Sequence, residues 1–181
     1  MDLSKEERSA IDRKEVERLL SLLRGVSWRE DGTVAMLVVT PRPHEHVVRE
    51  EVRVIRGKGF DGDHDRKSYY RGSYVPGREV SAITLEVLNV LGVEPSVVGD
   101  NLITHGIDLA SLEKGDVLQV GDVLLERSHR EHRPCETFRH RTSPEAFAIV
   151  SRGRYRGALF TVRATGTVRR GDPIRVVPPG T

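Results

Sequence analysis

The sequence contains one cysteine, Cys135, which lies in a segment, residues 127–141, that also holds five arginines and three histidines. A thiolate, not a thiol, acts as a nucleophile or metal ligand, and nearby cations stabilise the thiolate. The segment therefore places Cys135 where a reactive thiolate would be favoured. The other interpretation is a small buried hydrophobic side chain, as for most single cysteines. The polar neighbours of Cys135 and the preceding Pro134 leave both interpretations open.

The histidines near Cys135 raise the question of a zinc site. His129, His132 and Cys135 follow one another at intervals of three residues. A structural zinc site takes four ligands and usually includes a pair of cysteines, which this sequence does not have. The ligand count argues against zinc, and the histidines are then interpreted as solvated loop residues.

Residues 61–65, Asp-Gly-Asp-His-Asp, imitate the beginning of a calcium-binding loop. Such a loop needs glycine at its sixth position and a bidentate glutamate at its twelfth. Arg66 and Gly72 occupy those positions, so calcium is not expected. The segment belongs to a long glycine-rich stretch, residues 57–77, and loops of this length are usually functional. Its aspartates either hold a turn or form one wall of a binding pocket.

The composition is typical of one soluble globular domain. The chain has 181 residues, of which 37% are hydrophobic and 31% charged, and no linker divides it. The formal net charge of +2 argues against nucleic acid as a partner. The N-terminus carries no apolar signal segment, and no run approaches the roughly 18 apolar residues of a membrane span. We therefore expect a cytoplasmic location and no membrane partner.

Residues 1–32 are expected to form a helical extension. Ser4 and Glu7 fit a capping box, which satisfies free N–H groups at the start of a helix. Gly25 is the expected end of the helix. Its apolar face, at helical spacing, consists of Val16, Leu19, Leu20 and Leu23. This face is expected to pack against the remainder of the domain.

Residues 33–178 show the pattern of a mainly β fold (a β-rich α+β class). Strands are expected at residues 34–40, 52–54, 79–84, 101–104, 157–164 and 174–177, with a tight hairpin at 115–124. Short helices are expected at residues 85–91, closed by Gly92, and from Ser143 onward. Many short strands separated by turns predict a closed or nearly closed antiparallel β-barrel with a few short peripheral helices.

Five segments occur in an order that resembles the MOSC family, the module named after the C-terminal part of molybdenum-cofactor sulfurases. They are residues 57–64, 77–84, 99–109, 115–118 and 133–135. The resemblance extends over about residues 33–177, with Asp100 where the family usually has glutamate. It implies a β-barrel and a cysteine that ligates the molybdenum of a pterin cofactor or carries sulfur. Some bacterial members reduce N-hydroxylated bases.

The resemblance implies a molybdenum cofactor (molybdopterin) site with Cys135 as catalytic residue and molybdenum ligand. The cofactor-binding residues expected beside it are Arg133, Arg130 and Arg78 for the phosphate, Asn101 and Thr104 for the pterin edge, and Asp63. Arginine suits the phosphate because its paired N–H groups match phosphate oxygens. The chain has no lysine in a pyridoxal-phosphate context, so that cofactor is not expected.

Three functions are compatible with these residues. The first is molybdenum-dependent reduction of N-hydroxylated compounds, with electrons from a donor protein. The second is sulfur transfer, in which Cys135 holds a persulfide received from a sulfur donor and delivers it to a metal centre. The third is a non-catalytic module whose arginines bind an anionic partner.

Overall fold

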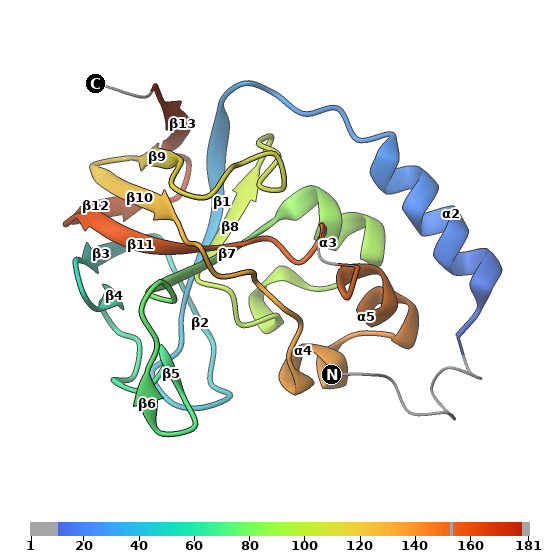
Figure 1. Cartoon of the computed structure of the whole chain (residues 1–181), viewed down its shortest axis with the longest axis horizontal. Coiled ribbons are helices and arrows are strands. Elements are labelled where there is room, and N and C mark those ends of the chain that lie inside the picture. The colour runs from blue at the N-terminus through green and yellow to red at the C-terminus, as the bar shows by residue number, and fades with distance from the viewer. Residues whose placement is uncertain (1–10, 153, 179–181) are drawn as a thin grey trace.

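The computed structural model describes residues 11–152 and 154–178, which form a β-barrel with helices on one side (Figure 1). The helices are α2 (Arg13–Arg24), α3 (Leu85–Leu91), η1 (Pro95–Val97), α4 (Glu136–Arg141) and α5 (Pro144–Val150). The barrel strands are β1 (Gly32–Val39), β7 (Val80–Thr84), β8 (Leu102–His105), β9 (Val117–Val120), β10 (Val123–Arg127), β11 (Ala158–Ala164) and β13 (Pro173–Val177). The remaining strands are β2 (Val47–Arg49), β3 (Glu51–Ile55), β4 (Gly59–Phe60), β5 (Tyr69–Tyr70), β6 (Ser73–Tyr74) and β12 (Gly166–Arg169).

Seven strands close the barrel in the order β13-β9-β10-β11-β7-β8-β1, and β2 pairs beside β1. Closure comes from β1 and β13, where Gly32 pairs with Ile174 and Thr33 with Pro173. Closing the sheet removes the exposed strand edges that would otherwise pair with other chains. The expected hairpin is present as β9 and β10, with Val123 opposite Val120. The mainly β barrel with few short helices is thus confirmed.

One strand pair departs from the expected antiparallel pattern. Strands β7 and β8 run parallel, with Ala82 opposite Leu102 and Thr84 opposite Thr104. Parallel neighbours need a crossover between them, and α3 and η1 supply it. Both strands are buried on their two faces. Ala82 and Leu102 belong to the core inside the barrel, whereas Ile83 and Ile103 face outward to the helices.

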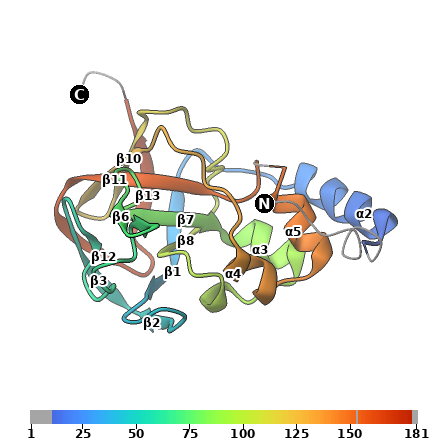
Figure 2. The same cartoon turned by 60° about the horizontal axis from the view of Figure 1, so that its bottom comes forward.

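The helices form a second core over the outward side of β7 and β8 (Figure 2). The predicted apolar face of α2 is buried and packs mainly on α3 and α5, so α2 covers the other helices rather than the barrel wall alone. The helix begins with Asp12, whose carboxylate accepts from Lys14 N and Glu15 N. The predicted cap of Ser4 and Glu7 lies outside the described residues.

The ends of the later helices agree with the sequence, with one exception. Ser143 Oγ accepts from Ala146 N at 3.0 Å and caps α5, with Pro144 in its first turn. Gly92 ends α3 in the left-handed conformation. The exception is α4, which directly follows Cys135 and for which no helix is expected from the sequence. The barrel, the loops that follow its strands and α4 together surround the site that contains Cys135.

Candidate functional site

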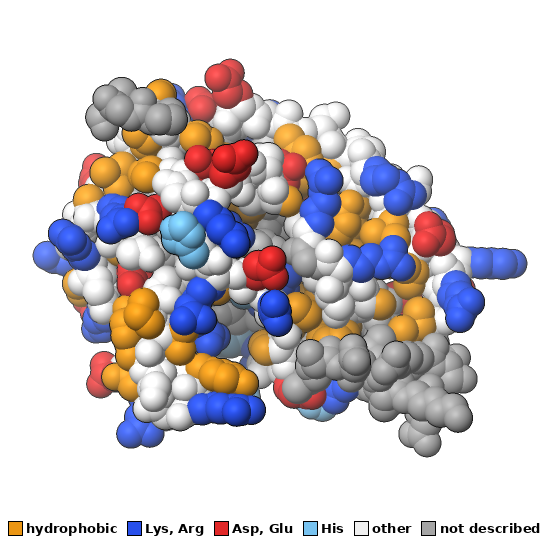
Figure 3. Space-filling model, viewed as in Figure 1, with side chains coloured by type: hydrophobic (Ala, Val, Ile, Leu, Met, Phe, Trp, Pro, Cys, Tyr) orange, Lys and Arg blue, Asp and Glu red, His pale blue; other side chains and the backbone are white. Residues whose placement is uncertain are grey.

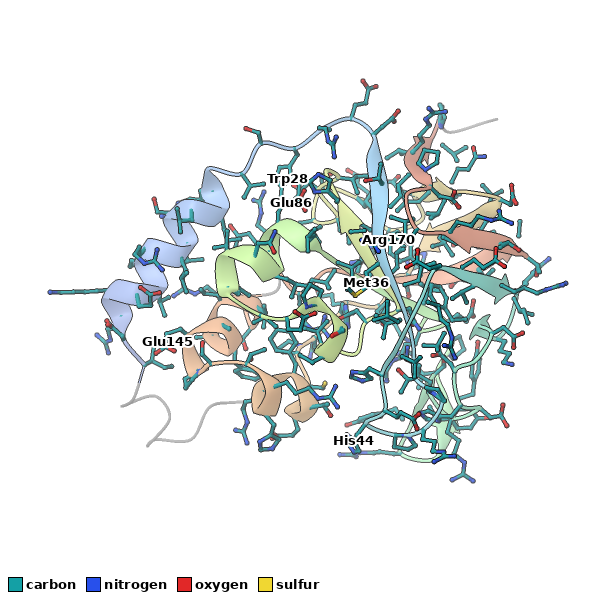
Figure 4. The ribbon with its side chains drawn as sticks, turned by 180° about the vertical axis from the view of Figure 1, so that it is seen from behind. Trp28, Met36, His44, Glu86, Glu145 and Arg170 are labelled. Carbon is teal, nitrogen blue, oxygen red and sulfur yellow. The ribbon has the colours of Figure 1, made fainter. Side chains whose placement is uncertain are left out.

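Cys135 lines a cavity of about 220 Å³ at the end of the barrel nearest α4. The cavity walls come from the end of β1, the β1–β2 loop, the loop before β5, the starts of β7 and β8, and α4. Figure 4 shows His44, one of the lining residues, in the β1–β2 loop at the lower end of the molecule, far from Trp28. Residues far apart in the sequence therefore meet in this cavity.

Cys135 occupies the N-cap position of α4 with an exposed side chain. Its carbonyl accepts from Arg139 N at 3.1 Å, whereas its side chain makes no capping hydrogen bond. The helix is anchored by Phe138, which is fully buried. Cys135 is thus not a small buried core residue, and its thiol faces a space that a ligand can enter.

A buried ion pair lies in the wall of the cavity. Arg156 Nη1 is 2.7 Å from Asp100 Oδ2, and both side chains are almost fully buried. Burial raises the pKa of Asp100, and the positive charge of Arg156 opposes this shift. The Arg156 guanidinium also lies 4.8 Å from the centre of the Phe138 ring, which ties the ion pair to α4. This pair fixes the position of α4 relative to the barrel.

His132 lies beside the ion pair. Its Nε2 is 3.6 Å from Asp100 Oδ1, and only 11% of its side chain is exposed. The interpretation of His132 as a solvated loop residue is therefore wrong. Burial, followed by the charge of Arg156, lowers the pKa of His132 well below its ordinary value. His132 is then neutral at physiological pH and has one donor and one acceptor nitrogen.

The cavity is rich in cations. Its lining includes Lys67, Arg78, Arg141 and Arg156. Lys67 Nζ is 3.3 Å from Asp63 Oδ2, and burial lowers the pKa of Lys67 while Asp63 opposes this effect. Asp63 and Asp100 balance two of the four positive charges. The remaining two favour an anionic ligand in the cavity.

Arg141 contacts a second histidine of the lining. Its Nη1 donates to Val97 O at 2.6 Å and lies 3.0 Å from His46 Nε2. His46 Nδ1 is 3.1 Å from Ser96 O, which accepts a hydrogen bond from the ring. Burial, then the charge of Arg141, lowers the pKa of His46. A neutral His46 with its proton on Nδ1 satisfies all these contacts.

Asn101 and Asp63 form the connection between two loops of the site. Asn101 Nδ2 donates to Asp63 Oδ2 at 2.8 Å and to Val38 O at 3.3 Å. Its Oδ1 accepts from Ser81 N at 3.3 Å. Asp63 also accepts from Thr40 N at 2.6 Å. Because the side chains of Asn101 and Asp63 are already bonded within the protein, they hold the loops in place. Residues 61–65 therefore serve both as a turn and as a support for the pocket wall.

The structure brings together only some of the residues expected at the cofactor site. Cys135, Arg78 and Asn101 line the cavity, and Asp63 supports it. Arg130 donates to Pro76 O, Arg133 is 84% exposed and pairs with Glu131, and neither is part of the cavity lining. Thr104 is fully buried in β8 and is also not part of the lining.

Several residues of the cavity were not expected from the sequence, among them Lys67, Arg141, Arg156 and His46. No local pattern marks Lys67 or Arg156, because they reach the cavity from remote segments. The helix α4 does have a local signal, since Glu136 lies in its first turn and Arg139, His140 and Arg141 in its last. Charges in this order favour the helix dipole.

Among residues 11–152 and 154–178, no group of three or more His, Cys, Asp or Glu side chains is arranged to hold a metal ion. A metal bound at Cys135 would therefore need most of its ligands from a cofactor. None of the described helices is long and apolar enough to cross a membrane.

Three solved structures resemble this chain in fold. The YUAD protein from Bacillus subtilis has a TM-score of 0.62 and 19% identity, over 80% of this chain and 94% of that chain. YiiM from Escherichia coli has a TM-score of 0.58 and 23% identity, over 82% and 71% of the two chains. YiiM from Geobacillus stearothermophilus has a TM-score of 0.56 and 17% identity, over 83% and 77%.

The sequence comparisons identify the family. None of the curated proteins matches the chain. The sequence model of the MOSC domain matches residues 73–175, which is more than half of the chain and runs from β6 to β13 with Cys135 inside the match. The chain therefore belongs to the MOSC domain family.

Proposed function

We propose that the Cys135 cavity binds the molybdenum cofactor and that the protein reduces N-hydroxylated compounds. The observation that carries the proposal is an accessible thiol in one cavity with four cationic side chains. MOSC domains are associated with this cofactor. Its sulfur-rich metal centre suits a soft thiolate ligand, and its phosphate suits the cations.

The residues of the cavity fit such a group in charge and in ligand type. Cys135 would supply the soft ligand, and Lys67, Arg78 and Arg141 the positive charge for the phosphate. The cavity of about 220 Å³ is smaller than the roughly 300–1,000 Å³ of sites that enclose a whole small molecule. It would therefore hold one end of the elongated cofactor.

Reduction of a hydroxylamine to an amine and water consumes two electrons and two protons. The bound molybdenum would supply the two-electron redox chemistry. The residues of the chain would position the reactants: Asp63 and Asn101 hold the loops, and Asp100 with Arg156 holds α4. Neutral His132, in the same lining as Cys135, is able to donate or accept a proton. The electrons would come from a separate donor protein.

The test is an activity assay of protein purified from a host that makes the cofactor. A chemical reductant replaces the donor protein, and an N-hydroxylated base is the substrate. We expect the amine to form with the native sequence and not with Cys135→Ser. A protein that carries its full complement of molybdenum yet forms no amine would contradict the proposed reaction.

Sulfur transfer is the second candidate, because the exposed side chain of Cys135 would be accessible to a sulfur donor. In that reaction the thiolate accepts one neutral sulfur atom and becomes a persulfide. Cyanide removes this sulfur as thiocyanate. About one cyanolysable sulfur per chain, without molybdenum, would favour this function. A third result would instead favour a non-catalytic module. The protein would bind anions but would contain neither molybdenum nor cyanolysable sulfur and would form no amine.

A further inference from the structure

A second, larger cavity is lined in part by residues 131–134, the segment that leads to Cys135. Its volume is about 900 Å³, which is sufficient for a small organic molecule. The walls come from residues 108–112, from the end of β10 and residues 131–134, and from four residues near β11, namely Ser151, Arg152, Arg154 and Gly157. His132 lines both cavities, so this one side chain forms part of the wall between them.

Arginines dominate the charge of this second cavity. The charged residues in its lining, apart from His132, are Arg127, Arg133, Arg152, Arg154, Asp108 and Glu131. On the face shown in Figure 3, blue Lys and Arg side chains are spread over the molecule, with fewer acidic side chains in red. The lining carries four positive and two negative charges, which leaves two positive charges in excess.

The two carboxylates of the lining are each paired with an arginine. Glu131 lies 3.6 Å from Arg133, and Asp108 lies 3.7 Å from Arg154. Within the described part of the chain, Arg127 and Arg152 have no carboxylate within the 4 Å of an ion pair, although the charge of Glu131 also acts on Arg127 over a longer distance. The two excess charges are therefore assigned to Arg127 and Arg152.

Arg127 is held in a fixed orientation. Its Nη1 donates to Ser128 O at 2.7 Å and to Arg130 O at 2.9 Å. Its Nε is buried and has no hydrogen-bond partner among residues 11–152 and 154–178. A cation whose geometry is fixed in advance loses little conformational entropy when it binds an anion.

Part of the cavity wall is apolar. Leu109 is almost fully buried, and Leu112 packs against the core of the barrel. Both contribute to the lining. We propose that this cavity binds a small organic dianion, with two carboxylates or a phosphate, whose charge lies against Arg127 and Arg152 and whose carbon skeleton lies against Leu109 and Leu112. This proposal does not rest on cofactor binding at Cys135.

The experiment is a titration of the protein followed by the NMR signals of methyl groups. The probes are succinate and inorganic phosphate, and neutral succinamide is the control for succinate. Leu109 and Leu112 report on the second cavity, whereas Val98 and Leu159 report on the Cys135 cavity. We expect saturable shifts of Leu109 and Leu112 with both anions and none with succinamide.

Two variants test the charge argument. Arg152→Gln should weaken succinate binding about tenfold, as expected for the loss of one charge-assisted hydrogen bond. The matched control, Arg170→Gln, removes an arginine from the turn between β12 and β13 (Figure 4) and should leave the affinity unchanged. Shifts confined to Val98 and Leu159, shifts that do not saturate, or equal affinity in the two variants would overturn the proposal.

Discussion

At the scale of single residues, the ion pair of Asp100 and Arg156 is the feature on which the cavity wall depends. A buried ion pair gains little over apolar packing, but removal of one partner leaves an uncompensated charge. Asp100 is inaccessible to solvent, so without Arg156 its charge would be stabilised only by the Ser81 hydroxyl and the charge of Lys67. The pair therefore specifies the position of α4 more than it adds to stability.

Replacement of Arg156 by methionine should lower the free energy of unfolding by about 3–5 kcal/mol, because Asp100 loses its partner. The control is Arg163→Met. Arg163 is 48% exposed and pairs with Glu126 at the surface, so its removal should cost about 0–1 kcal/mol. Urea denaturation measures both values. A similarly small loss of unfolding free energy in the two variants would contradict a structural role of the buried pair.

His132 should make stability depend on pH. Because burial lowers its pKa in the folded protein, the unfolded chain binds more protons below the ordinary histidine value of about 6.5. The contribution of neutral His132 to the free energy of unfolding is complete above that pH and is lost as the pH falls below it. The free energy of unfolding, plotted against pH, should then have a slope that approaches about 1.4 kcal/mol per pH unit. Denaturation between about pH 5 and 7 should show a smaller slope for His132→Gln, and equal slopes would contradict a neutral, buried His132.

At the scale of elements, α2 is an integral layer of the helical core. Leu20 on its inner face is 4% exposed, whereas Leu22 on its outer face is 48% exposed. Leu20→Ala should cost about 2–5 kcal/mol, because it leaves a cavity between α2 and the helices below it. Leu22→Ala should cost less than about 0.5 kcal/mol. Equal costs in thermal or urea denaturation would mean that α2 does not pack as observed.

The elements also show where sequence patterns were sufficient. The apolar face of α2, the cap at Ser143 and the turn at Gly121 depend on neighbours a few residues away, and all three form as expected. The parallel pairing of β7 and β8 depends instead on where α3 places the returning chain. The start of α4 is not predicted by the sequence, because Pro134 and the charged neighbours of Cys135 are typical of a loop.

At the scale of the whole molecule, the cavity is a product of topology. Cys135, Arg78 and Asn101 were predicted at the site, since the family's motifs mark all three. Lys67 and Arg156 are 89 positions apart in the chain and line the same cavity only because the fold brings their segments together. Arg130 and Arg133 are close to Cys135 in sequence, but this closeness does not determine the direction of a side chain, and neither lines the cavity.

The central claim is that Cys135 and the cavity around it hold the molybdenum cofactor. The most direct test is the molybdenum and pterin content of native and Cys135→Ser protein, purified side by side from a host that makes the cofactor. The serine variant keeps nearly the same volume at an exposed position, so it should fold as the native protein does. We predict molybdenum and pterin at about one per chain in the native protein, and molybdenum lost in the variant because the soft ligand is gone. Equal molybdenum in the two proteins, or none in the native protein, would contradict the claim.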